Sequence, residues 1–154
     1  MKKYLILVVV YLISLACIAQ QDYDWIERGI SITLPNDFEE PVMSSESFSS
    51  HGDGMTYEIN VVNDNSIDER HINKFALDIA KKINFELTSK IHKVDVHGFV
   101  ASYAQGKIEE NSYYLLGMID PDSHIHFYIL VSFESFDEVE IEEALDILLS
   151  VRST

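Results

Sequence analysis

The chain has 154 residues, of which 47% are hydrophobic and 24% are charged, ordinary values for one packed globular domain. Six Gly and three Pro residues exclude collagen-like and low-complexity disordered classes. The charge is unusual, because 26 Asp and Glu residues against 11 Lys and Arg residues give a formal net charge of −15. Such a surface repels nucleic acid and anionic lipid, so neither is expected as a partner.

The beginning of the chain has the pattern of a secretory signal peptide. Lys2 and Lys3 form a positive start, residues 4–15 are uncharged and mostly apolar, and small residues follow. This apolar run is shorter than the roughly 20 residues that a transmembrane helix needs, and no second apolar run occurs. We therefore expect export, and no transmembrane segment in the mature chain.

Two processing sites compete in this segment. Cleavage after Ala19 makes residues 1–19 the signal peptide and leaves residues 20–154 as a single domain, either periplasmic or secreted. Alternatively, Ser-Leu-Ala-Cys at 14–17 is a permissive lipobox, and Cys17 becomes the lipidated start of a membrane-anchored lipoprotein. Cleavage after Ala19 removes two lysines and the only cysteine, so the mature domain has a net charge of −17 and no disulfide or thiol nucleophile.

The N-terminal part of the mature domain predicts two strands. Residues 29–34 alternate apolar and polar side chains until Pro35 ends the pattern. Residues 55–62 alternate in the same way, which predicts one buried face and one mostly wet face. Residues 44–54 between them are polar, small and Gly-containing, so they predict a surface loop.

A helix is expected over residues 66–87. Ser66 and Glu69 form a capping box, in which the Ser hydroxyl accepts from a free backbone N–H group and the Glu reaches back. The apolar residues that follow recur at helical spacing and predict one buried stripe. They are Ile72, Ala76, Ile79, Ala80, Ile83 and Leu87.

Four further strands are expected in close succession, over residues 91–96, 99–108, 113–120 and 124–133. Their connections are too short for parallel crossovers, so adjacent strands pair as antiparallel hairpins. The second and third of these strands are apolar on both faces, which indicates that both of their faces are covered. The last strand has one unbroken apolar face, formed by Ile125, Phe127, Ile129, Val131 and Phe133.

A second capping box, from Ser135 to Glu138, begins a C-terminal helix. Acids crowd its first turns, where the helix dipole favours them. The expected order is β-β-α-β-β-β-β-α. This order predicts an α+β domain, in which an antiparallel sheet of about six strands is packed against its helices.

The domain resembles the Mog/PsbP/DcrB-like fold family of small exported or adaptor domains over residues 26–152. Residues 30–38 are similar to the opening strand and Pro-containing turn of that family, residues 96–101 to its meander, and residues 147–152 to its closing segment. The resemblance implies a binding or scaffold domain with no common chemistry, and it identifies no functional residue.

His124 and His126 are the strongest candidates for a metal site. Residues i and i+2 of a strand share a face, so two imidazoles could hold one ion, with Asp120 or Asp122 as a third ligand. The alternative is a pair of half-exposed histidines at the start of a strand. Because no third ligand stands at a fixed spacing, we expect no metal and no cofactor.

Other patterns favour structural roles. His51 and Asp53 lie beside glycines, as turn residues do. The stretch 64–75 begins like a calcium loop but lacks the Gly and Glu that such a loop requires. The chain has no G-x-S-x-G, H-E-x-x-H, P-loop or G-x-G-x-x-G motif, so an enzyme is not expected.

These observations predict an exported, non-catalytic binding or scaffold domain of the bacterial cell envelope that recognises a protein, for which a basic surface would suit the charge. Tyrosines supply contact area and acids steer a basic partner. The candidate partner-binding residues are Tyr113, Tyr114, Tyr128, Glu140, Glu142 and Glu143. One alternative is a periplasmic immunity protein that neutralises a toxin. An alternative of a different class is a metal-dependent hydrolase that uses His124 and His126.

The first prediction concerns processing. N-terminal sequencing of the protein from its native host is expected to begin at Gln20, because the charged start and short apolar run direct export and cleavage. A lipid-modified Cys17 would favour the lipobox instead. An intact Met1 would contradict both.

Overall fold

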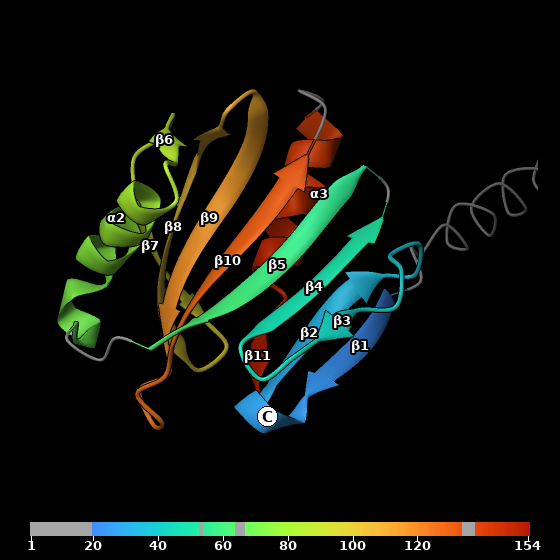
Figure 1. Cartoon of the computed structure of the whole chain (residues 1–154), viewed down its shortest axis with the longest axis horizontal. Helices are drawn as coiled ribbons and strands as arrows, with labels where there is room; N and C mark the ends of the chain where they lie inside the picture. The colour runs from blue at the N-terminus through green and yellow to red at the C-terminus, as the bar shows by residue number, and fades with distance from the viewer. Residues whose placement is uncertain (1–19, 53, 64–66, 134–137) are drawn as a thin grey trace, which may run out of the picture.

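The computed structural model describes residues 20–52, 54–63, 67–133 and 138–154 (Figure 1). The predicted signal peptide and Cys17 lie outside these residues. Ser66 and Ser135, the predicted helix caps, lie outside them as well.

A large antiparallel sheet organises the domain. Its strands are β3 (Val42–Met43), β4 (Ser47–Gly52), β5 (Met55–Val62), β6 (Glu86–Leu87), β7 (His92–Val96), β8 (Phe99–Ile108), β9 (Asn111–Ile119) and β10 (His126–Phe133). The spatial order is β3-β4-β5-β10-β9-β8-β6, with β7 also paired to β8. The expected antiparallel meander of β7 to β10 is confirmed, and β5 joins it beside β10.

This sheet has eight strands where about six were expected, because β3, β4 and β6 are added and the predicted strand at 29–34 lies in a separate sheet. The stretch at 44–54, which was predicted as a surface loop, is mostly a strand. It contains β4, which pairs with β5 and buries Phe48 completely. Ser50 is also buried, and its Oγ donates to the carbonyl oxygen of Glu39. Since a serine whose hydroxyl is bonded can face a core, the polar composition of this stretch concealed a strand.

A second, three-stranded sheet packs beside the first. It consists of β1 (Gln20–Trp25), β2 (Ile30–Pro35) and β11 (Arg152–Ser153), with β2 in the middle. A short 3-10 turn, η1 (Ile26–Arg28), joins β1 to β2 and ends at Gly29, whose φ of 64° favours glycine. The polar sequence of β1 gave no strand signal, and the structure adds this strand to those expected.

The first helix is shorter than expected. A 3-10 turn, η2 (Glu69–His71), leads into α2 (Ile72–Lys82). Asn84 then adopts a φ of 55°, its N–H donates to the Lys81 carbonyl, and the N–H of Phe85 donates to the Ala80 carbonyl. This is a Schellman motif. The expected extension to Leu87 is wrong, because the motif ends the helix and places Leu87 in β6.

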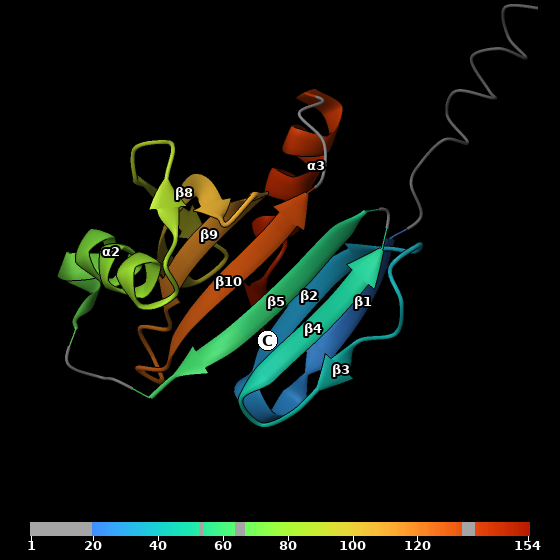
Figure 2. The ribbon, with the colours of Figure 1, turned by 45° about the horizontal axis from the view of Figure 1, so that its top comes forward.

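The two helices lie on opposite faces of the large sheet (Figure 2). α3 (Glu138–Leu148) and the three-stranded sheet pack on one face, and α2 packs on the other. The strands of the meander contribute side chains to the hydrophobic cores on both faces of the sheet, as expected. In β9, Tyr114, Leu116 and Met118 face α3, whereas Leu115 and Ile119 face α2. The domain is therefore an α+β fold of three layers.

The second prediction concerns the core between the large sheet and α3. Phe127 is completely buried there, with its ring edge-on to that of Phe99 at 6.3 Å. We expect Phe127→Ala to lower the free energy of unfolding by about 3–5 kcal/mol in urea melts, because truncation leaves a cavity. Lys93→Ala, at an exposed position of β7, is the control and should cost about 1 kcal/mol or less. Equal losses would contradict the burial assigned to Phe127.

Candidate functional site

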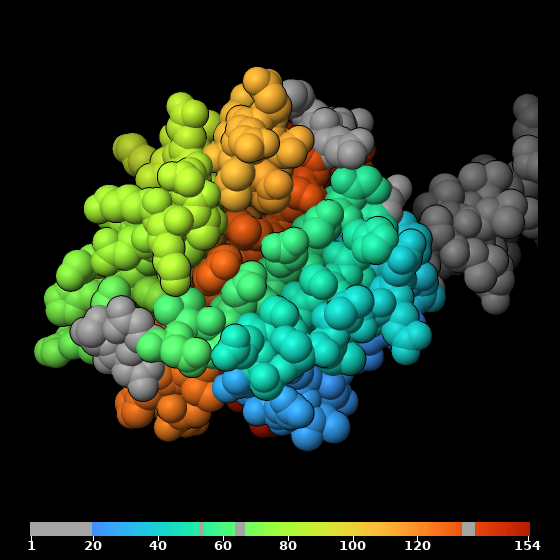
Figure 3. Space-filling view, in the orientation of Figure 1, coloured from blue at the N-terminus to red at the C-terminus, as the bar shows by residue number. Residues whose placement is uncertain are grey.

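The face of the large sheet that carries α2 is only partly covered. α2 packs on β8 and β9, and β4, β5 and the adjoining part of β10 are left open. We call this region the open sheet face. Figure 3 views it directly and shows atoms of β10 at the bottom of a hollow between α2 and β5. Its residues are Ser47, Ser49, Thr56, Glu58, Asn60, Tyr113, Tyr128, Leu130 and Ser132.

Two small hollows lie along the open sheet face. One, of about 220 Å³, is lined by Thr56, Glu58, Ile108, Tyr113, Leu130 and Ser132. The other, also about 220 Å³, lies where β5 ends against α2 and includes Val62, Phe75 and Asp78. Each is small and is lined by both apolar and polar side chains. This size suits single side chains of a macromolecular partner better than a whole small molecule.

Tyr113 and Tyr128 are the predicted partner-binding residues that this face brings together. Both are half-buried on the α2 side of the sheet. Burial raises the pKa of the Tyr128 phenol, and the nearby Glu58 carboxylate raises it further. The phenol therefore stays neutral at physiological pH and keeps its O–H as a donor.

Tyr114, the third tyrosine among the predicted partner-binding residues, lies on the other face of β9. Successive residues of a strand point to opposite faces, so Tyr114 lies in the core beneath α3 and is only 6% exposed. Its ring lies 5.6 Å from that of Phe133, and burial raises the pKa of its phenol, with a smaller contribution from Tyr103.

The predicted acids lie on the other side of the molecule. Glu142 and Glu143 of α3, with Asp146, line a groove of about 630 Å³ against the three-stranded sheet. Glu140 is on the same helix but does not line this groove. Arg152 lines the opposite side of the groove, where its side chain is bound to residues of the three-stranded sheet. The six predicted residues thus divide between two faces and the core, and they do not form one site.

The sheet wall of this groove is held by a polar cluster. Arg152 Nη2 lies 2.8 Å from a carboxylate oxygen of Asp22, and its Nη1 donates to Thr33 Oγ1 at 3.0 Å. Thr33 Oγ1 in turn lies 2.6 Å from Asp22, to which it donates. The hydrogen bonds from Thr33 and Arg152 lower the pKa of Asp22. This cluster fastens β11 to β1 and β2.

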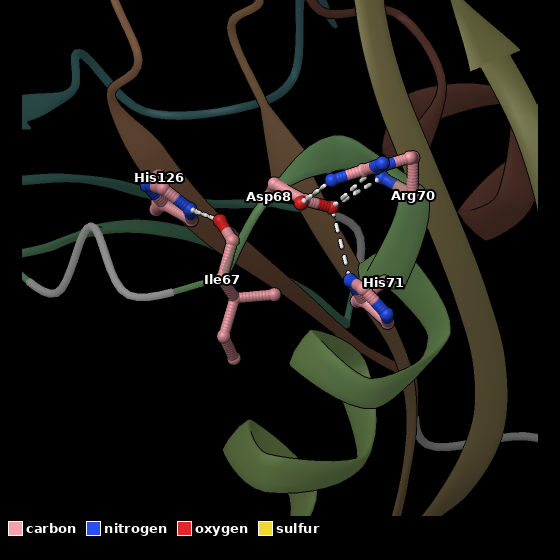
Figure 4. Close-up of polar contacts among 5 residues, drawn as sticks. All are labelled: Ile67, Asp68, Arg70, His71 and His126. Carbon is pink, nitrogen blue, oxygen red and sulfur yellow. Dashed lines mark hydrogen bonds and ion pairs between the residues drawn. The ribbon is translucent and has the colours of Figure 1, made fainter.

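His124 and His126 were expected to share one face of a strand, and this expectation is wrong. β10 begins at His126, and His124 is an exposed residue of the preceding turn with a φ of 58°. His126 is only 2% exposed, so the half-exposed pair is also wrong. Its Nε2 lies 2.7 Å from the Ile67 carbonyl oxygen (Figure 4). Its Nδ1 lies 3.1 Å from the His124 carbonyl oxygen. The imidazole donates to at least one of these carbonyl oxygens, so buried His126 links the turn before β10 to the approach to α2.

The remaining predicted positions have structural contacts. His51 Nε2 lies 3.1 Å from a Glu39 carboxylate oxygen on the surface, and Asp53 lies outside the described residues. Asp68 caps η2, with its carboxylate accepting from Arg70 and His71 (Figure 4). The hydrogen bonds from Arg70 lower the pKa of the Asp68 carboxyl most, and the one from His71 lowers it further. Over the described ranges, no three His, Cys, Asp or Glu side chains gather as a metal site would require.

Neither a known family nor a curated protein matches the sequence. Solved structures match its fold. LpqN of Mycobacterium tuberculosis, involved in cell envelope biogenesis, superposes with a TM-score of 0.55 at 13% identity, over 88% of this chain and 91% of LpqN. The Ran-binding protein Mog1p of Saccharomyces cerevisiae superposes with a TM-score of 0.51 at 9% identity, over 86% of this chain and 85% of Mog1p.

A protein of Bacteroides thetaiotaomicron superposes with a TM-score of 0.51 at 15% identity. The match covers 87% of this chain but 48% of the other, so the chain spans about half the length of that protein. This chain shares the fold of LpqN and Mog1p. The expected resemblance is confirmed at the level of fold, which by itself assigns no activity.

Glu58 and Leu130 line the same hollow as Tyr113, and neither was predicted from the sequence. The signal that could have found them is the pairing of β5 with β10, which places Leu130 directly opposite Glu58. Strands distant in sequence pair without a local signature, so alternation alone did not identify this neighbour.

The third prediction concerns the buried histidine. We expect His126→Ala to lower the free energy of unfolding by about 2–4 kcal/mol at pH 7, because truncation leaves a cavity, at least one carbonyl oxygen loses its imidazole donor and the Phe75 ring loses an edge contact. His124→Ala, at an exposed position, is the control and should cost about 0.5 kcal/mol or less. Urea denaturation of both variants decides this. Similar losses of unfolding free energy in the two variants would contradict the structural role of His126.

Proposed function

We propose that this chain is an exported, non-catalytic domain of the cell envelope that binds a protein through the open sheet face. The observation that carries the proposal is the position of Tyr113 and Tyr128, half-buried beside Leu130 where cover by α2 ends. Large apolar and aromatic side chains at the centre of a patch, surrounded by polar groups, are typical of protein interfaces.

The composition of the face supports a protein rather than a small substrate. Its outer strands present Ser, Thr, Glu and Asn side chains, and its centre presents two tyrosines and a leucine. Each hollow has a volume of about 220 Å³, which is less than the roughly 300–1,000 Å³ typical of small-molecule sites. The acidity of the chain favours a partner with a basic surface, since opposite charge accelerates association.

The structural neighbours are consistent with this proposal. LpqN is involved in cell envelope biogenesis, and Mog1p is a Ran-binding protein. No helix in the described parts of the chain is long and apolar enough to cross a membrane. The proposed location rests on the N-terminal segment and on the envelope neighbour.

The fourth prediction tests this surface by comparative capture from the native envelope. Proteins retained by the wild-type domain are identified by mass spectrometry and compared with those retained by the double variant Tyr113→Ser with Tyr128→Ser. We expect the double variant to lose the main partner and to weaken its binding at least about tenfold, because the central anchors of an interface supply most of its affinity.

The matched control is Tyr103→Ser, which truncates a half-buried tyrosine on the opposite face of the same sheet. It should retain the partner within about threefold, since residues outside an interface contribute little to binding. Equal retention by all three proteins would contradict the assignment of the face. Stoichiometric zinc in the purified wild-type protein, accompanied by hydrolytic turnover, would favour the metal-dependent hydrolase instead.

A further inference from the structure

Exposed apolar side chains gather at a second place, at the end of β1 and on β3. Ile26 is 86% exposed and Met43 is 47% exposed. They are two of the six large exposed hydrophobic residues in the described part of the chain, and both line one hollow although they come from different segments. Grouped apolar exposure of this kind marks interaction sites more often than single exposed residues do.

A hollow of about 460 Å³ lies within this group. Ile26 and Met43 line it, Asp24 and Glu27 bring carboxylates to it, and Trp25 is part of its wall. We call these residues the β3 patch. Figure 1 shows the turn after β3 beside the end of β1, in the lower part of the view and away from α2. The β3 patch shares no lining residue with the two hollows of the open sheet face.

The β3 patch is held in place before any partner binds. The indole N–H of Trp25 donates to the Ser44 carbonyl oxygen at 2.9 Å, and the Arg28 guanidinium donates to the Ser45 carbonyl oxygen. The turn itself is closed by the N–H of Ser44, which donates to the Ser47 carbonyl oxygen at 2.8 Å. A site that is already ordered loses little conformational entropy on binding, which favours affinity.

The charge of the β3 patch selects the chemistry of its occupant. Asp24 and Glu27 flank the apolar group, and the nearby Arg28 directs its guanidinium onto a backbone carbonyl. With a net charge of −15 on the whole chain, an anionic lipid surface is repelled. A second copy would bring the same acids to the contact. The complementary occupant is an apolar side chain with Lys or Arg beside it.

We propose that the β3 patch is a second interaction surface, which binds a protein segment in which an apolar anchor is flanked by basic residues. The anchor enters the hollow between Ile26 and Met43, and the basic residues face Asp24 and Glu27. This surface is separate from the open sheet face, so the domain could hold two proteins at once.

The experiment selects ligands from a phage-displayed library of random dodecapeptides on the purified protein. The most enriched sequence is then synthesised, and its Kd is measured by fluorescence polarisation. We expect the enriched peptides to combine a large apolar residue with neighbouring Lys or Arg. Ile26→Ser with Met43→Ser should weaken the peptide at least about tenfold, because both walls of the hollow are lost.

Charge is tested by Asp24→Asn with Glu27→Gln, which should weaken the peptide about threefold to tenfold at 50 mM salt and by less at 500 mM, where the carboxylates are screened. The matched control is Leu87→Ser, at an exposed leucine of β6 on the opposite edge of the same sheet. It should leave the Kd within about twofold, since the residue is remote from the β3 patch. The Tyr113→Ser with Tyr128→Ser variant should bind the peptide normally, which separates this surface from the open sheet face.

Several outcomes would overturn the proposal. They are the absence of any enrichment, enrichment of acidic or uncharged peptides, and equal binding by the Ile26→Ser with Met43→Ser variant. Binding to vesicles of phosphatidylcholine and phosphatidylglycerol that this variant abolishes would assign the patch to a lipid surface. A dimer in sedimentation velocity that the same variant dissociates would assign it to a second copy of the chain.

Discussion

The meander of β8, β9 and β10 is apolar on both faces, and the rest of the structure depends on that constraint. A sheet of this kind cannot leave either face to water, so the chain must supply a layer on each side. α3 and the three-stranded sheet supply one layer and α2 supplies the other. The two cores meet only through the strands, and for this reason neighbouring residues such as Tyr113 and Tyr114 have different environments.

The two layers differ in width, which explains where the open sheet face lies. A helix is about 10 Å across and strands are about 4.8 Å apart, so one helix covers about two strands. α2 covers β8 and β9 and cannot also cover β5 and β4. The side chains that β4 and β5 present on this face are accordingly polar, such as Ser49 and Glu58. Tyr128 and Leu130 of β10 lie at the boundary between these polar strands and the part of the sheet that α2 covers.

Much of the fold could be predicted because the local periodicity of apolar side chains indicates its strands and helices. The strands at 55–62 and 99–108 have the expected bounds, and the two-sided character of the meander is confirmed. Other elements had no local signal. β1 is polar and is held by its pairing with β2, and Ser50 faces a core only because its hydroxyl reaches the Glu39 carbonyl. The end of α2 depended on Asn84 adopting a left-handed conformation, which the apolar stripe continuing to Leu87 concealed.

The candidate site was predictable to the same degree and for the same reason. Alternation places Tyr113 and Tyr128 on one face once β9 and β10 pair, because Gly117 lies opposite Tyr128 and Tyr113 lies opposite Ser132. The alternation could not predict which residues of that face are half-buried, like Tyr128, and which are fully buried, like His126. Their exposure depends on how far α2 extends over the sheet. His126 lies under the approach to α2, against Phe75, whereas Tyr128 is two residues further along the strand. The edge of one short helix thus decides which side chains of β10 hold the fold together and which remain available to a partner.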